Sequence, residues 1–177
     1  MNADLVFRRA LIVDGGGGEP QVGDVAVDGG SIVAVEPSLG TIAARRTVDA
    51  AGLALMPGII DSHTHFDAQI TWDPTLAPSP ALGVTTAVIG NCGFTIAPCR
   101  PADRERTMQN LTQVEGMSLA ALRAGIDWRF ETFPEYLAQL RARGAAVNVA
   151  AYVGHSSVRT WVMGAEAATR AATELEI

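Results

Sequence analysis

The first part of the chain alternates short apolar runs with turn residues, a pattern typical of strands. "DLVFRRALIVD" precedes four glycines, "GDVAVDGGSIVAVEP" places two β-branched runs around Asp28-Gly29-Gly30, and "RTVDAAGLALMPG" adds a further strand and turn. A glycine pair between β-branched runs favours a hairpin. We therefore expect a β-rich segment over residues 1–52. Its glycine run, Gly15–Gly18, predicts a flexible turn, because the Lys-Ser/Thr ending of a phosphate loop is missing.

From Leu53 onward the apolar runs are longer and less alternating. Three of them predict strands buried on both faces: "LALMPGIIDSHTH", "GVTTAVIGNCG" and "AAVNVAAYVGH". Helical patterns lie between and after them, in "RPADRERTMQNLTQVEGM", "TFPEYLAQLRARG" and the final "GAEAATRAATELEI". The second helix has the clearest limits, because Thr132 and Glu135 form a capping box and Gly144 is a C-terminal stop.

This alternation of strands and helices predicts parallel pairing and an α/β fold for residues 53–177. Polar residues follow each of the three apolar runs, and in β/α barrels the active site lies at the carboxyl ends of the strands. We therefore expect the N-terminal portion of a (β/α)8 TIM-type barrel. Such a barrel takes about 250 residues, so we expect an N-terminal fragment with about three β/α units.

Composition narrows the classes of partner. Hydrophobic residues make up 48% of the chain, which favours a globular protein. The net charge of -6 argues against nucleic acid, because phosphate binding needs a concentrated positive surface. Neither a signal peptide nor an apolar run of membrane-spanning length is recognisable, so we expect a soluble, cytoplasmic protein. All 13 basic residues are arginine. The sequence therefore offers no lysine that could bridge two metal ions.

The strongest chemical signal is "MPGIIDSHTHFD", which holds two of the three histidines. Residues two apart in a strand point to the same side, so Asp61, His63 and His65 share one face if the segment is extended. Two imidazoles at a strand end can clamp a metal ion. The alternative is a pair of buried, hydrogen-bonded histidines. The neighbouring acids Asp61 and Asp67 favour the metal hypothesis.

Later segments add further candidates. Cys92 follows the second apolar run, and parallel pairing would bring it to the histidines; a thiolate with imidazoles is a zinc-type ligand set. Spacing alone is equally compatible with a small buried cysteine. His155 follows the third run and either lines the same site or holds a loop, while Arg159 either recognises a carboxylate or has a structural role. We place Cys99, in a loop-like segment, outside the site.

Together these residues resemble the amidohydrolase superfamily. A β-rich segment that precedes "PGIIDSHTHFD" at the entry to a barrel is similar to the opening of that superfamily's sequences. Three later segments resemble the N-acyl-D-amino-acid deacylase (D-aminoacylase) branch: "GNCGF", "DWRFETFPEYLAQL" and "NVAAYVGHSSVR". The resemblance spans Leu5–Ile177. It implies that residues 1–52 belong to a small β-sandwich domain and that residues 53–177 begin the hydrolase barrel.

The resemblance implies a site for one or two zinc ions. His63 and His65 match the first two metal-binding histidines of the family. Cys92 matches the metal-ligating cysteine of the branch, which replaces the carboxylated lysine of other amidohydrolases. The remaining candidates, for contact with the substrate or support of the ligands, are Asp61, Asp67, His155 and Arg159.

The implied reaction is hydrolysis of an N-acyl-D-amino acid, a small molecule, to a carboxylate and a D-amino acid. The two later histidines and the general acid/base aspartate of the family have no match here. We expect them beyond Ile177, so the isolated chain should be inactive. A cyclic amidohydrolase, similar to hydantoinases or dihydroorotases, and a non-catalytic amidohydrolase-like module are the alternatives. The oligomeric state is left open.

Overall fold

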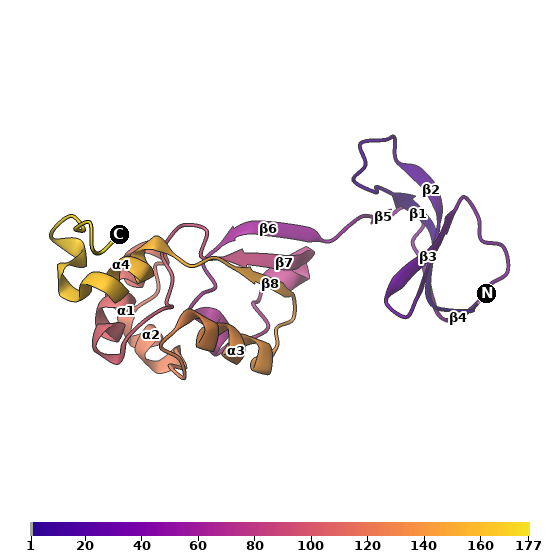
Figure 1. The fold of residues 1–177 in the computed structure, drawn as a ribbon. Helices are drawn as coiled ribbons and strands as arrows, with labels where there is room; N and C mark the ends of the chain where they lie inside the picture. Colours follow the sequence, from indigo (N-terminus) through magenta and orange to yellow (C-terminus); the bar gives the residue numbers. More distant parts are fainter. Residues whose placement is uncertain (1) are drawn as a thin grey trace. The chain divides into compact units, whose positions relative to one another are not determined.

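The computed structural model describes residues 2–177, and the chain divides between Pro57 and Gly58 into two compact units (Figure 1). The boundary predicted after residue 52 precedes strand β5 (Ala54–Leu55), which pairs with a strand of the first unit. Each unit has its own sheet, β-rich in the first and parallel in the second.

The first unit is a five-stranded sheet in the order β3-β2-β1-β4, with β5 also paired to β1. The longer strands are β1 (Asn2–Ile12), β2 (Gln21–Asp28), β3 (Ser31–Glu36) and β4 (Ala43–Asp49). The predicted hairpin is confirmed, because β2 and β3 are antiparallel and the connecting Gly29 and Gly30 have positive φ angles. Its core is small and contains the buried Ala3, Val6 and Ala26.

The second unit is built on a three-stranded parallel sheet in the order β6-β7-β8. Its strands are β6 (Ile59–Thr64), β7 (Val84–Ile89) and β8 (Asn148–Ala151). Its α-helices are α1 (Arg104–Val114), α2 (Leu119–Gly125), α3 (Phe133–Arg143) and α4 (His155–Met163). The unit also has four 3-10 helices: η1 (Gln69–Thr71), η2 (Ser79–Leu82), η3 (Pro101–Asp103) and η4 (Gly164–Ala168). The predicted parallel α/β arrangement is confirmed; across residues 2–177 the sheet is open rather than closed into a barrel.

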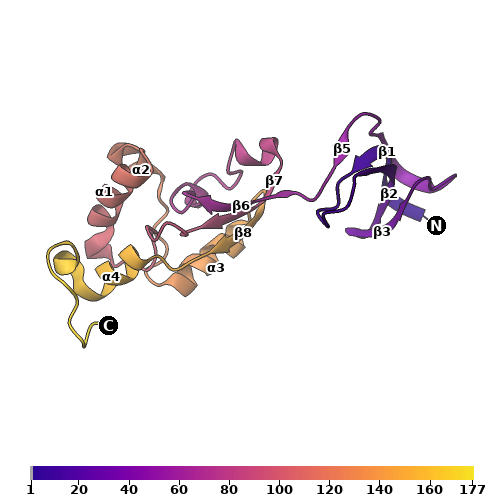
Figure 2. The same cartoon turned by 90° about the horizontal axis from the view of Figure 1, so that it is seen from above.

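Helix α3 packs against one face of the parallel sheet (Figure 2). The core there joins Tyr136 and Leu140 of α3 to Ile89 of β7 and to Val149 and Ala151 of β8. Along β8 the burial alternates between exposed and half-buried positions, and β6 is mostly exposed. The prediction of strands buried on both faces was therefore wrong, because in the described part of the chain the second face of these strands stays open.

Two further expectations differ from the structure. The run that begins at Leu53 is not one strand, because Met56, Pro57 and Gly58 separate β5 from β6. Proline cannot donate to a strand ladder. Gly58 packs so closely that a Cβ atom there would lie 2.1 Å from the Thr85 hydroxyl oxygen.

The segment after Gly164 was predicted to be a helix, but it forms only the short η4 followed by turns. The Arg170 side chain binds the carboxylates of Glu166 and Glu176, and the Arg159 side chain donates to the carbonyls of Ala167 and Arg170. These contacts fold the segment back towards α4, which the sequence pattern did not predict. The predicted capping box of α3 is confirmed in full. None of the described helices is both long and apolar enough to cross a bilayer.

Candidate metal site

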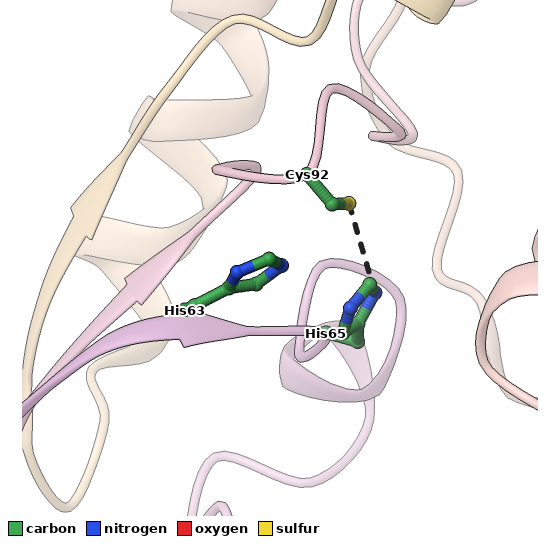
Figure 3. Close-up of side chains that lie close together, drawn as sticks. All are labelled: His63, His65 and Cys92. Atoms are coloured by element: carbon green, nitrogen blue, oxygen red, sulfur yellow. Dashed lines mark hydrogen bonds between the residues drawn. The ribbon is translucent and has the colours of Figure 1, made fainter.

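Parallel pairing of β6 with β7 places the candidate ligands at one end of the second sheet. Thr64, the last residue of β6, is paired with Ile89, the last residue of β7. His63 lies near the end of β6, and His65 is the first residue after that strand. The turn after β7 carries Cys92, so the three side chains converge above the strand ends (Figure 3).

The donor atoms of His63, His65 and Cys92 all lie within 4.8 Å of one another. The Cys92 Sγ is 3.7 Å from the Nδ1 of His65. The two imidazole rings are 5.4 Å apart between centroids and inclined by 33°. A tetrahedral zinc ion has bonds of about 2.0–2.3 Å, which places neighbouring donors roughly 3.5 Å apart. The three residues therefore fit a zinc ion after small movements, and their thiolate and imidazole donors are those that zinc prefers.

Cys92 lies in a tight turn rather than at the end of the strand itself. Gly90 and Gly93 flank it with φ angles of 80° and 86°, and the Gly93 N–H donates to the Gly90 carbonyl at 3.0 Å. The backbone N–H of Phe94 donates to the Cys92 Sγ at 3.4 Å. This turn directs the half-buried sulfur towards His65.

Two polar contacts fasten this turn and β7 to β6. The Asn91 side-chain amide donates to the Ser62 carbonyl at 2.8 Å. The buried Thr64 hydroxyl donates to the Val88 carbonyl at 2.9 Å. Asn91 was not among the residues expected to support the site. Its position next to Cys92 in "GNCGF" was the only signal in the sequence.

The two aspartates lie on either side of the histidines in different environments. The Asp61 carboxylate accepts from the backbone N–H of His63 at 3.2 Å, and it lies outside the group of three donors. Asp67 is buried, and this burial raises the pKa of its carboxyl to about 7. Its Oδ2 atom has no hydrogen-bond partner within residues 2–177. Burial, together with the nearby Asp67, raises the pKa of Glu115 to about 8.

The two remaining candidates lie on α4, and Cys99, which we placed outside the site, lies beside α1. His155 begins α4, is exposed and lies outside the group of three donors. The Arg159 Nε donates to the Ala167 carbonyl at 2.7 Å. Cys99 is buried, with its Sγ 3.3 Å from the Thr107 hydroxyl, and it also lies outside the group.

The described donor set could hold a metal ion and has the thiolate and imidazole chemistry that zinc prefers. Catalytic zinc sites hold the ion with three protein ligands and leave a further position for water or substrate. His63 is exposed, so an ion held by these residues would be accessible from solvent. The arrangement is suited to metal-assisted hydrolysis.

Comparison with known proteins gives relatives over the whole chain. N-acyl-D-aspartate deacylase of Alcaligenes xylosoxydans xylosoxydans is 41% identical, over 98% of this chain and 32% of that protein. D-aminoacylase of the same organism is 38% identical, over 98% of this chain and 33% of that protein. A crystal structure of D-aminoacylase superposes with a TM-score of 0.80 at 37% identity, over 98% of this chain and 34% of that one. The structure of N-acyl-D-glutamate deacylase of Bordetella bronchiseptica superposes with a TM-score of 0.79 at 33% identity, over 99% of this chain and 34% of that one.

The chain thus spans about a third of the length of the relatives that it matches. The model of the amidohydrolase family matches residues 46–177, which is most of the chain and includes all three candidate ligands. The chain belongs to the amidohydrolase family, and D-aminoacylase and other N-acyl-D-amino-acid deacylases are its homologues.

Proposed function

We propose that these residues form the first part of a zinc-dependent deacylase acting on N-acyl-D-amino acids, and that His63, His65 and Cys92 are ligands of its metal centre. The observation that carries the proposal is the convergence of these three donors within 4.8 Å at the ends of two neighbouring parallel strands. In this proposal the parallel sheet is the opening of a (β/α)8 barrel, and the N-terminal sheet is part of a small β-sandwich.

Two relatives support the choice of reaction and metal. The structure of N-acyl-D-glutamate deacylase contains zinc and a phosphonate inhibitor that mimics the tetrahedral intermediate of the reaction. A D-aminoacylase of known structure has a binuclear metal centre, with activation by one metal and attenuation by the second. One or two ions are therefore compatible with this chain.

When bound, zinc would polarise the amide carbonyl of the substrate and lower the pKa of a bound water. The chain's own contribution is to hold and orient that ion. The Asp61 carboxylate, which accepts from the His63 N–H, lies beside the donors, and the Asp67 backbone carbonyl links the segment after His65 to Tyr136 of α3. His155 is exposed and available to a substrate, whereas the bonds of Arg159 to backbone carbonyls favour a structural role.

Proton transfer needs a further group. The chain spans about a third of the length of the deacylases that it matches, and we assign the general acid/base and the remaining ligands to the part of the deacylase that it does not cover. We therefore expect the 177 residues alone to bind zinc without hydrolysing N-acyl-D-amino acids. The whole deacylase would hydrolyse them.

The test compares two cysteine variants of the same chain. Cys92→Ala should lose most of the bound zinc, and Cys99→Ala, which removes the other, buried thiol, should keep it; metal analysis after dialysis measures both. Equal zinc in Cys92→Ala and in the unmodified chain would remove Cys92 from the site. Robust hydrolysis of N-acetyl-D-aspartate or N-acetyl-D-glutamate by the 177 residues would overturn the assignment of proton transfer to residues outside them.

A further inference from the structure

We propose that Ser156, at the start of α4, is a positioning residue for Cys92, because it anchors the turn that carries the thiol. This inference rests on the proposed metal function, but its geometry involves residues outside the group of donors. It assigns a role to a serine of the "GHSS" segment, whose serines are neither among the three donors nor among the substrate candidates.

The anchor is the backbone carbonyl of Gly93, one residue after Cys92. This oxygen accepts two hydrogen bonds from one residue: the Ser156 N–H donates at 2.9 Å and the Ser156 hydroxyl at 2.8 Å. The N-cap of α4 is Gly154, which offers no side-chain acceptor to the first helical N–H groups. The Gly93 carbonyl takes that role, so the turn that carries Cys92 also caps α4.

A second contact holds the other side of the same turn. The Ser157 hydroxyl donates to the Thr95 carbonyl at 2.6 Å, and the two side-chain oxygens of Ser157 and Thr95 are 2.7 Å apart. Both residues are buried. Buried hydrogen bonds of this kind are costly to break, because the freed carbonyl cannot pair with water.

The packing leaves the turn no room to shift against α4. A Cβ atom on Gly154 would lie 2.6 Å from the Thr95 side chain and 2.7 Å from the Gly93 carbonyl oxygen. A Cβ atom on Gly90 would lie 2.6 Å from the Tyr152 carbonyl oxygen. The segment that leads from β8 into α4 therefore lies directly against the turn on both sides of Cys92, and it restricts the position of the thiol.

Loss of the Ser156 hydroxyl removes one of the two bonds to Gly93 and lets the turn sample other conformations. The separation of the Cys92 sulfur from His65 would then vary, and an ion held between them would lose affinity. Residues that orient metal ligands in this way typically contribute about 10- to 100-fold to metal affinity.

The experiment compares three serine variants of the 177-residue chain. Ser156→Ala removes the anchoring hydroxyl, and Ser156→Thr keeps a hydroxyl at the same position. Ser118→Ala is the matched control, because the Ser118 hydroxyl caps α2 by accepting from the Ala121 N–H at 3.2 Å and takes no part in the hydrogen bonds that hold the turn. All three are compared with the unmodified chain.

The first measurement is the rate at which Cys92 reacts with iodoacetamide in metal-free protein, resolved from Cys99 by peptide mapping. The second is a cobalt titration followed through the thiolate-to-cobalt absorption band. For Ser156→Ala we expect alkylation several-fold faster and cobalt binding about tenfold weaker. Ser156→Thr should restore both values, and Ser118→Ala should leave both at those of the unmodified chain.

Unchanged alkylation and cobalt affinity in Ser156→Ala would overturn the inference and leave the proposed function intact. An equal acceleration in Ser118→Ala would also overturn it, because a general loss of stability would then explain the effect. If the unmodified chain takes up no cobalt while Ser156→Ala alone alkylates faster, the anchoring role is supported and the proposed metal function fails.

Discussion

The hydroxyl of Tyr136, near the start of α3, donates a hydrogen bond of 2.9 Å to the backbone carbonyl of Asp67. Tyr136 is buried and its ring packs near those of Phe130 and Phe133. This bond ties α3 to the segment that follows His65, across a wide separation in sequence. The segment after His65 is therefore held by α3, and the turn that carries Cys92 is held by α4.

We predict that Tyr136→Phe destabilises the second unit by about 1–2 kcal/mol, because a buried carbonyl loses its donor while the ring is kept. All three tryptophans lie in the second unit, so their fluorescence in urea reports its unfolding separately from that of the N-terminal sheet. Phe133→Leu is a control that changes a neighbouring ring without removing a hydrogen bond. If the free energy of unfolding of Tyr136→Phe equals that of the unmodified protein within error, the Tyr136 hydroxyl does not stabilise the unit, because water can take its place as donor to the Asp67 carbonyl.

A pair of glycine substitutions separates backbone strain from steric conflict. Gly90 and Gly116 both have positive φ angles, but a Cβ atom on Gly90 would lie 2.6 Å from a carbonyl oxygen and one on Gly116 would have open space. We expect Gly116→Ala to cost about 1 kcal/mol and Gly90→Ala about 3 kcal/mol, since overpacking adds to the strain. Equal losses in urea unfolding would contradict the tight packing of the turn.

The stability of the second unit should fall as the pH rises. Burial raises the pKa of Glu115 to about 8, and the neighbouring Asp67 adds to this effect. The folded state then binds its proton more tightly than the unfolded state, whose Glu pKa is about 4.5. The contribution is fully present below about pH 4.5 and is lost as the pH rises through about 8.

Glu115→Gln has no proton to lose at this position, so we expect a shallower fall in the free energy of unfolding between pH 5 and 8. It should be more stable than the unmodified protein at the upper end. The measurement is urea unfolding in the presence of a chelator across that range. Glu131→Gln, at an exposed position, is the control. The same slope in both variants would argue that Glu115 is already charged in the folded protein.

Short sequence motifs correctly predicted where a helix begins and where a hairpin turns. The capping box from Thr132 to Glu135 identified the start of α3, and Gly29 and Gly30 identified the hairpin between β2 and β3. Parallel pairing was enough to place Cys92 near His63 and His65, because the carboxyl ends of neighbouring parallel strands meet. Their role as ligands stays a prediction.

Long-range packing explains what the sequence pattern did not predict. The apolar runs indicated burial on both faces, but apolar residues alone do not say whether another element lies within reach, and Ile60 of β6 is 66% exposed. The last segment has helix-forming residues, yet the contacts of Arg159 and Arg170 hold it in turns. Ser156 stood beside the more conspicuous His155, and nothing local marked it as the partner of Gly93.

The three candidate donors lie at the ends of two adjacent strands, and His65 and Cys92 are only 27 positions apart in the chain. The entropy lost on closing a loop grows slowly with its length, by about 0.6 kcal/mol for each doubling. An ion joining these residues would act as a short-range crosslink that could form as soon as β6 and β7 pair. Metal capture would then be an early event in the folding of this protein, and a means of stabilising its first two parallel strands.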